Sequence, residues 1–273
     1  MTQKVALVTG ASAGMGKDFV KALLGEGMVV YAVARRVENM EDLKALGAHP
    51  LKMDITKEED VQSVVHTISK EHGGVDVLIN NAGFGSYGSV EDTTIEDARY
   101  QFEVNLFGLA RLTQLVLPYM RSKQAGKVIN ISSMVGKVYM PLGAWYVGTK
   151  HALEGWSDCL RVELKQFGID VVIIEPGAIV TEFGDVVSGP MMERSGNGPY
   201  SNMAHKVDEM FKAEYEKGAG SPVSVITNLV LKAIRAKKPK TRYVAGKYAM
   251  PMMLMRKWLG DRFYDRALMN MMK

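Results

Sequence analysis

Tyr146 and Lys150, separated by three residues in the segment YVGTK, are well suited to acid–base chemistry. They lie in a stretch of helical periodicity that continues to Leu164, and residues four apart share one face of a helix. A phenol with a pKa of about 10 exchanges protons poorly at neutral pH, but a neighbouring ammonium stabilises its phenolate. We therefore expect Lys150 to lower the pKa of Tyr146 and make it a usable acid or base, although this spacing alone is also typical of a surface pair.

Two further polar residues, Ser133 and Asn105, are candidates for a catalytic role. Ser133 follows the apolar run 127–131, and ligands of open α/β sheets bind beyond the carboxyl ends of the strands. Asn105, in FEVNLFG, lies inside a helical pattern although asparagine is a mediocre helix former. For Asn105 the alternative is a buried amide with a purely structural role.

The segment VALVTGASAGMGKDF places Gly10, Gly14 and Gly16 between the first predicted strand and a helix that begins near Gly14. Glycine permits the positive φ and close backbone approach that such a turn needs, and a helix N-terminus offers free N–H groups to a pyrophosphate. The spacing G-x3-G-x-G differs from the general dinucleotide fingerprint, and an ordinary strand-to-helix turn is the alternative.

Arginine, not a carboxylate, follows the second predicted strand, MVVYAVARR. A carboxylate here typically binds the ribose 2′-hydroxyl of NAD, whereas a guanidinium can hold the 2′-phosphate of NADP through charged hydrogen bonds. Arg35 and Arg36 therefore favour NADP(H), with two solvated arginines as the alternative. Asp54, after the third strand, can accept a bond from an adenine amino group or cap the helix that follows.

Strands and helices alternate along the chain, so these residues are expected on a Rossmann-like, doubly wound parallel α/β sheet in a single domain, 1–273. The predicted strands are 5–8, 28–33, 75–79, 127–131 and 171–174, with weaker ones at 51–53 and 242–245. The carboxyl ends of these strands bring Ser133, the glycine turn, the Asn80–Gly83 loop and Pro176–Gly177 to one edge. The segment 181–222 is too long for an ordinary connection and is expected to be a substrate-binding lid.

Composition limits the class of protein. The 273 residues are 47% hydrophobic, and the formal charge of +4 from 34 basic and 30 acidic residues does not suggest nucleic-acid binding. With Cys159 as the sole cysteine and no leader-like segment before the first strand, a cytoplasmic location is expected. No apolar run approaches the ~18 residues of a membrane span, and no metal site is expected.

Six motifs in this order resemble those of the short-chain dehydrogenase/reductase family, over residues 4 to about 182. They are TGASAGMG (Thr9–Gly16), NNAG (Asn80–Gly83), Asn105, Ser133, YxxxK (Tyr146, Lys150) and PGxxxT (Pro176, Gly177, Thr181). The resemblance and the residues together predict an NADP(H) site made by Gly10, Ser12, Gly14, Met15, Gly16, Arg35, Arg36, Asp54, Ile55, Asn81, Ala82, Gly83, Tyr146, Lys150, Pro176, Gly177 and Thr181. Ala13 departs from relatives with a basic residue there, which leaves the 2′-phosphate mainly to Arg35.

The resemblance also implies a role for each catalytic residue. Tyr146 would protonate the substrate carbonyl in reduction, and Ser133 would polarise that carbonyl. Lys150 would hold the nicotinamide ribose and lower the pKa of Tyr146. Asn105 would anchor a water that links Lys150 to solvent, and Thr181 would bond the nicotinamide carboxamide.

Apolar side chains near the motifs predict a hydrophobic ketone or secondary alcohol as substrate, although each of them could equally pack the core. They are Phe84, Tyr87, Met134, Val135, Tyr139, Met140, Trp145, Phe183, Met191 and Met192. The length and the segment VYAVARR resemble retinoid- and steroid-active members of the family. A catalytically silent NADP(H)-sensing protein on the same fold is the alternative function.

The C-terminal extension, about 246–273, holds seven of the 19 methionines together with several basic residues. Such an amphipathic basic segment can rest on a membrane surface, cover the substrate pocket or contact a partner subunit, and we favour packing on the protein. Family resemblance implies a homodimer or homotetramer formed through the helices that carry Asn105 and Tyr146.

Overall fold

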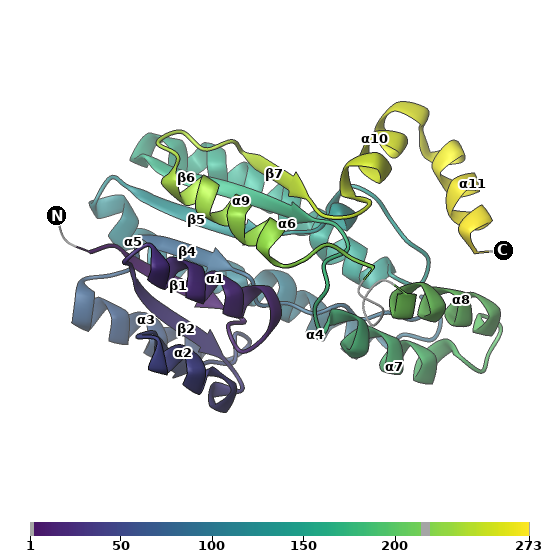
Figure 1. Cartoon of the computed structure of the whole chain (residues 1–273), viewed down its shortest axis with the longest axis horizontal. Helices are drawn as coiled ribbons and strands as arrows, with labels where there is room; N and C mark the ends of the chain where they lie inside the picture. The colour runs from purple at the N-terminus through teal and green to yellow at the C-terminus, as the bar shows by residue number, and fades with distance from the viewer. Residues whose placement is uncertain (1–2, 214–218, 273) are drawn as a thin grey trace.

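Seven parallel strands form the centre of the computed structural model, which describes residues 3–213 and 219–272 (Figure 1). The strand order is β3-β2-β1-β4-β5-β6-β7, and every neighbouring pair is parallel. The strands are β1 (Val5–Thr9), β2 (Val29–Ala34), β3 (His49–Lys52), β4 (Val77–Asn80), β5 (Gly126–Ile131), β6 (Ile169–Pro176) and β7 (Arg242–Ala245). The predicted single-domain, doubly wound α/β sheet is confirmed.

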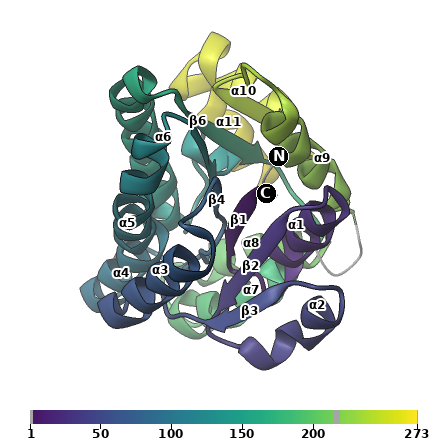
Figure 2. The same ribbon diagram turned by 90° about the vertical axis from the view of Figure 1, so that its left-hand side faces the viewer.

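Helices cover both faces of the sheet, as Figure 2 shows from one end. One face is covered by α1 (Gly14–Gly25), η1 (Val37–Met40), α2 (Glu41–Ala45) and α9 (Ser224–Arg235). The other carries α3 (Glu58–His72), α4 (Ile95–Phe102), the π-helical η2 (Glu103–Gly108), α5 (Leu109–Ser122), α6 (Ala144–Leu164) and η4 (Lys165–Phe167). This two-sided cover explains why the strands are apolar on both faces.

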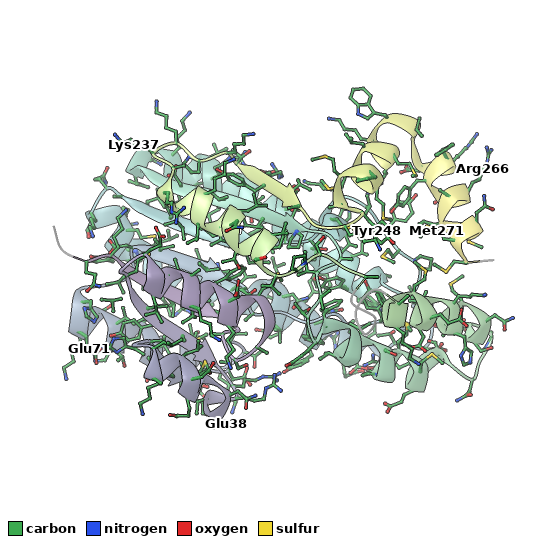
Figure 3. All side chains as sticks on the ribbon, viewed as in Figure 1. Glu38, Glu71, Lys237, Tyr248, Arg266 and Met271 are labelled. Atoms are coloured by element: carbon green, nitrogen blue, oxygen red, sulfur yellow. The ribbon has the colours of Figure 1, made fainter. Side chains whose placement is uncertain are left out.

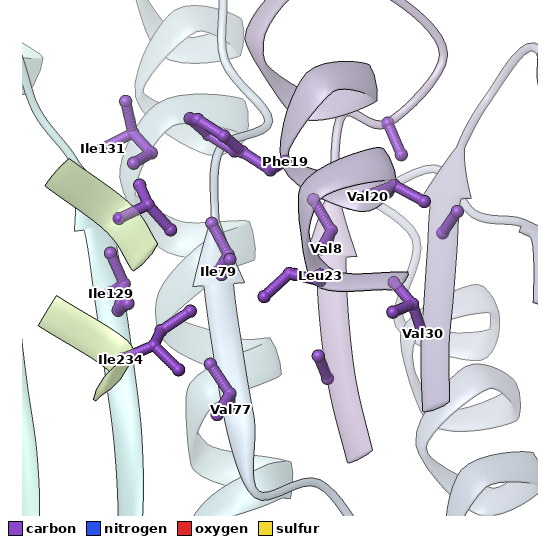
Figure 4. Close-up of a cluster of buried hydrophobic side chains, with 14 of the residues drawn as sticks. Val8, Phe19, Val20, Leu23, Val30, Val77, Ile79, Ile129, Ile131 and Ile234 are labelled. Atoms are coloured by element: carbon purple, nitrogen blue, oxygen red, sulfur yellow. The ribbon is translucent and has the colours of Figure 1, made fainter. Parts of the chain in front are cut away.

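The larger core cluster lies between the sheet and α1 and α9. Phe19 and Leu23 of α1 pack against Ile79 and Ile129 of the central strands, and Ile234 of α9 closes the cluster (Figure 4). Close packing here fixes α1 against the sheet and therefore fixes the position of its N-terminus. A short 3₁₀ helix, η1, leads directly into α2 at Met40, and both pack on this cluster.

The segment expected as a lid contains two helices in the part that the structure describes. Helices α7 (Phe183–Ser195) and α8 (Ser201–Phe211) pack together beyond the carboxyl ends of the strands (Figure 1). Arg194 ties α7 to the loop after β4 by donating to Tyr87 O (3.1 Å), and to α4 by an ion pair with Asp97 (3.1 Å). Part of the expected lid, 214–218, lies outside the described residues.

The C-terminal extension forms α10 (Ala249–Leu259) and α11 (Asp261–Met271), which project from the same end of the molecule. Figure 3 places Tyr248 where the extension leaves the body, and Arg266 and Met271 on α11. Tyr264 and Leu268 are buried in a cluster shared with the lid, so one face of the extension packs on the protein, as favoured above. Among the described helices, none combines the length and apolarity needed to traverse a bilayer.

Candidate active site

The glycine turn requires glycine for two reasons, which are the positive φ angles of Gly10 and Gly14 and the close backbone approach at Gly16. Gly10 and Gly14 have positive φ angles of +66° and +51°, which other residues rarely adopt. A Cβ at Gly16 would lie 2.2 Å from the carbonyl oxygen of Gly10, so no side chain fits there. These glycines bring the N-terminus of α1 close to the ends of β1 and β4.

Asn81 and Thr9 connect the glycine turn to the loop after β4. The Thr9 hydroxyl accepts hydrogen bonds from the backbone N–H groups of Asn81 (3.0 Å) and Ala82 (2.9 Å). The Asn81 amide donates back to the carbonyl oxygens of Thr9 (3.0 Å) and Gly10 (3.3 Å). The preceding residue, Asn80, instead donates to Asn130 of β5 (2.9 Å). The NNAG motif therefore ties three strand ends together at one edge of the sheet.

The N-terminus of α1 fits a pyrophosphate. No side chain caps the helix at Ala13, and its first turn contains no acidic residue. Thr181 covers the turn, with its Cγ2 3.5 Å from where a Cβ on Gly14 would lie. Free N–H groups at a helix N-terminus, on a turn without bulky side chains, are the expected partners of the phosphates of a dinucleotide.

A cleft along this edge gathers most of the predicted cofactor residues. Those that line it are Gly10, Ser12, Gly14, Met15, Arg35, Arg36, Asp54, Ile55, Asn81, Ala82, Gly83 and Thr181. Gly16 instead lies beneath Gly10, and Lys150 beside Gly83, while Tyr146, Pro176 and Gly177 line an adjoining cavity. Ala13 of the glycine turn and two residues predicted for the substrate pocket, Phe84 and Phe183, also line the cleft. The sequence did not single out the remaining lining residues, which are Val33, Ala34, Met53, Tyr100, Val104, Glu182 and Val186.

Arg35 and Arg36 are exposed where β2 ends at the cleft. Within the described parts of the chain, neither guanidinium has a carboxylate at ion-pair distance; Arg35 donates to the Tyr100 hydroxyl (3.1 Å). Tyr100 therefore positions Arg35, a contact that no sequence motif signals. Two cations at the end of the cleft suit a phosphate group.

Asp54 serves the loop after β3 with its side chain. Its Oδ1 accepts hydrogen bonds from the backbone N–H (3.1 Å) and hydroxyl (2.8 Å) of Thr56. Burial raises the pKa of Asp54, but these bonds and the charges of Arg35 and Lys57 outweigh it and hold the pKa below its ordinary value. Asp54 is thus an ionised acceptor at the cleft, and it also caps its own loop.

Tyr146 lies at the floor of the second cavity, together with Ser133. The two residues share a hydrogen bond, and the rings of Tyr87 (5.9 Å between centroids) and Phe183 (5.6 Å) flank the phenol. This cavity meets the cofactor cleft, because Met15, Thr181 and Phe183 line both. The phenol and the serine hydroxyl therefore line a cavity that adjoins the cofactor cleft, and Phe183, whose ring lies against Tyr146, lines both spaces.

The charge state of Tyr146 differs from the sequence-based prediction. Burial raises its pKa to about 12, and the hydrogen bond from Ser133 lowers it by less. Lys150 is buried as well: its Nζ donates to Ile131 O (2.9 Å) and lies 5.8 Å from the centre of the Tyr146 ring. Burial lowers the pKa of Lys150 to about 8, and the charge of Glu154 opposes that change. The prediction that Lys150 gives Tyr146 a low pKa is therefore wrong for the protein groups alone, because desolvation dominates.

Asn105 is a buried clamp in the π-helical η2. Its Oδ1 accepts from Phe84 N (3.0 Å), and its Nδ2 donates to Phe84 O (2.9 Å) and Thr149 Oγ1 (3.1 Å). A Cβ on Gly83 would lie 3.1 Å from Asn105 Oδ1 and 3.9 Å from Lys150 Nζ. Asn105 thus fixes the NNAG loop against the catalytic helix, which is the structural role considered above, and it remains close to Lys150.

The predicted apolar residues divide between the cavity and its surroundings. Tyr87, Met134, Val135, Met140 and Phe183 line the cavity, and Ile179 and Phe211 join them without having been predicted. The others lie elsewhere: Phe84 lines the cofactor cleft, Tyr139 packs on Tyr264 of the extension, and Trp145, Met191 and Met192 line neither space. Phe211 comes from α8, far away in sequence, where no local motif marks it.

Comparison with known proteins identifies the family. The family model described as short chain dehydrogenase matches residues 4–189. The chain belongs to the short-chain dehydrogenase/reductase family. One relative, the NADPH-dependent 3-dehydrocapnine reductase of Ornithobacterium rhinotracheale, is 36% identical over 282 residues, covering 99% of this chain and 98% of the relative. The 3-ketodihydrosphingosine reductase of Bacteroides thetaiotaomicron is 33% identical over 271 residues, covering 98% and 97%.

A solved structure agrees with the fold of this short-chain dehydrogenase. The crystal structure of a short-chain dehydrogenase from Streptomyces avermitilis superposes with a TM-score of 0.84 at 33% identity, covering 94% of this chain and 93% of that one. The protein is therefore an oxidoreductase of this family, whose members bind nicotinamide cofactors and act on alcohol or carbonyl groups.

Proposed function

We propose that the protein is an NADP(H)-dependent carbonyl reductase or alcohol dehydrogenase for hydrophobic ketones and secondary alcohols. The observation that carries this proposal is that the cavity lined by Tyr146 adjoins the cofactor cleft. An apolar cavity, floored by Tyr146 and Ser133, opens into a cleft whose far end carries Arg35 and Arg36. Reduction is the expected direction, because NADPH is generally used as a reductant.

In this proposal the chain's own residues bind, orient and exchange a proton. The nicotinamide, when bound, supplies or accepts the hydride. Tyr146 carries its proton at neutral pH and donates it to the substrate carbonyl oxygen, while the Ser133 hydroxyl hydrogen-bonds to the same oxygen. Lys150 would hold the nicotinamide ribose, and Thr181 would contact the carboxamide. Asn105 keeps the NNAG loop in place beside them. It would also anchor a water that links Lys150 to solvent.

Mutation of Tyr146 tests the chemical role. Tyr146→Phe should lower kcat/KM for ketones by about 10²- to 10⁴-fold, the usual contribution of a general acid. It should leave the Kd for NADPH within about twofold, since only one hydroxyl is removed. The control is Tyr243→Phe, because Tyr243 lies on β7 and lines neither space. Retention of ketone reduction by Tyr146→Phe would refute the assigned acid.

The cofactor preference rests on Arg35 and Arg36. Arg35→Ser should weaken NADPH binding about 10- to 100-fold, as expected for loss of a charge-assisted bond to phosphate, and should leave NADH binding unchanged. Arg121→Ser is the matched control, because Arg121 is exposed at the end of α5, on the opposite edge of the sheet. An equal loss of NADPH and NADH affinity would count against a 2′-phosphate site.

Initial-rate measurements with both cofactors would define the substrate class. The panel should contain steroid and retinoid ketones, 3-ketodihydrosphingosine, and the corresponding alcohols. Two relatives support its composition, because their names make them reductases of 3-dehydrocapnine and of 3-ketodihydrosphingosine. If the protein binds NADPH but turns over no compound of this panel, the alternative of a nucleotide-sensing protein would be favoured.

The proposal also covers the oligomeric state and the location of the protein. A homodimer or homotetramer is expected through α4, η2, α5 and α6, where Phe107 and Val162 are 54% and 69% exposed. We also propose a cytoplasmic location. Membrane-surface contact by the C-terminal extension is the less favoured option, and liposome flotation before and after removal of residues 249–273 would test it.

A further inference from the structure

Two buried glutamates, Glu154 and Glu175, lie behind the active site and line neither the cofactor cleft nor the substrate cavity. Glu154 lies on α6, one helical turn after Lys150, and Glu175 is the penultimate residue of β6. Their exposed fractions are 3% and 0%. Two carboxyl groups at such depth need a compensating arrangement, because an isolated buried carboxylate is strongly disfavoured.

A single guanidinium joins the two carboxyl groups. The Nε of Arg242, on β7, lies 3.0 Å from Glu154 Oε2 and 3.5 Å from Glu175 Oε1. Lys137 adds a second cation, with its Nζ 2.9 Å from Glu154 Oε2. Arg242 also pairs with Asp158 (2.6 Å), which lies nearer the surface. Both carboxyl groups therefore crowd around the same donor.

The hydrogen bonds of the pair are incomplete when both groups are ionised. Glu154 Oε1 and both oxygens of Glu175 find no donor among the described residues. A proton on Glu175 would supply a donor to Glu154 and would remove the repulsion between two like charges. Burial and the negative charge of Glu154 raise the pKa of Glu175 to about 7, while Lys137 and Arg242 act in the opposite direction.

We propose that Glu154 and Glu175 hold one proton between them, as a carboxylic acid bonded to a carboxylate, and that this proton controls the charge facing Lys150. When it leaves to solvent, the pair changes from one negative charge to two between Arg242 and Lys137. No other bond is made or broken. Glu154 and Glu175 are thus positioning residues, acting through Lys150.

The link to Lys150 follows from the geometry of α6. Residues four apart lie on one face of a helix, and the Glu154 charge favours the ammonium form of Lys150. Burial, partly opposed by the charge of Glu154, lowers the pKa of Lys150 to about 8. A second negative charge, appearing as the pair loses its proton, keeps Lys150 charged to a higher pH.

Infrared difference spectroscopy of the whole protein tests the shared proton without any turnover. Wild-type protein should show the C=O stretch of a protonated carboxyl at pH 6 that disappears by pH 9. The band should be absent from Glu175→Gln, and in Glu154→Gln it should be lost at lower pH, because the neighbouring charge is removed. Glu163→Gln, on the exposed side of α6, is the control and should match wild type. A band that is unchanged in Glu175→Gln, or absent from wild type, would overturn the proposal.

The effect on Lys150 is read from the Kd of NADPH between pH 6 and pH 10. This measurement rests on the cofactor site proposed above, whereas the infrared band does not, so the two proposals can fail separately. Loss of the Lys150 proton should weaken binding. The midpoint of that change should fall by about one pH unit in Glu154→Gln and by about half a unit in the more distant Glu175→Gln. Midpoints equal to wild type in both variants would refute the link to Lys150.

Discussion

Burial of Tyr146 predicts which direction of the reaction depends on pH. Oxidation of an alcohol releases one proton, so the ratio of the rate constants for oxidation and reduction must change tenfold per pH unit whatever the mechanism. The pKa of the group that exchanges the proton decides which direction carries this change. Below that pKa the base form is scarce and oxidation rises with pH, whereas above it the acid form is scarce and reduction falls.

The structure gives the magnitude. With a pKa of about 12 for Tyr146, about one phenol in 10⁵ is ionised at pH 7 and about one in 10³ at pH 9. The kcat/KM for alcohol oxidation should therefore rise about 100-fold between these values, while the kcat/KM for ketone reduction stays within about twofold. If Lys150 instead held the phenol near pH 7, reduction would fall and oxidation would be flat.

Initial rates of both directions with saturating cofactor, measured at pH 7, 8 and 9, distinguish these cases. The Kd of the cofactor at each pH is the control, because titration of Lys150 changes cofactor binding whereas titration of Tyr146 does not. A tenfold fall of reduction per pH unit above pH 7, with constant oxidation and constant Kd, would show that burial does not set the charge state of Tyr146.

Three further predictions concern stability and assembly. The pKa of Glu175 lies above its ordinary 4.5, so the fold loses stability as the pH rises from about 4.5 to 7. Glu175→Gln removes this loss. It should raise the free energy of unfolding, measured by chemical denaturation, by about 1–3 kcal/mol at pH 8 and should change it little at pH 4.5. Gly16→Ala should lower the Tm, since overpacking costs about 1–3 kcal/mol, whereas Gly25→Ala, with open space around it, should not. Phe107→Lys should shift light scattering towards monomer, while the equally exposed Leu46→Lys should not.

Local patterns predicted the sheet and the cofactor edge well. The apolar strands, the glycine turn and the NNAG loop are contiguous in sequence, and parallel strands bring their carboxyl ends to one edge. The strand 242–245 was predicted at its observed bounds, and Gly14 begins α1 as expected. The sequence therefore predicts the part of the site that consists of short segments directly after strands.

Long-range contacts account for what the sequence did not reveal. Phe211 reaches the cavity from α8, and Tyr100 reaches Arg35 from α4, and neither is marked by a local pattern. Met191 and Met192 are as apolar as the cavity residues, but the packing of α7 turns them away from it. The raised pKa of Tyr146 was also missed, because spacing reports that an ammonium is near and does not report how deeply the phenol is buried.

Burial pushes both catalytic groups towards their neutral forms, since it raises the pKa of Tyr146 and lowers that of Lys150. A neutral phenol is suited to donate a proton to a carbonyl. A neutral Lys150 amine, however, would bind a ribose hydroxyl more weakly than a charged ammonium does. The charge of Glu154 opposes loss of the Lys150 proton, and Arg242 forms an ion pair with Glu154 (3.0 Å). The reduction chemistry proposed for the buried edge of the sheet therefore depends on a chain of alternating charges that extends from Arg242 to Lys150, behind the residues that touch the substrate.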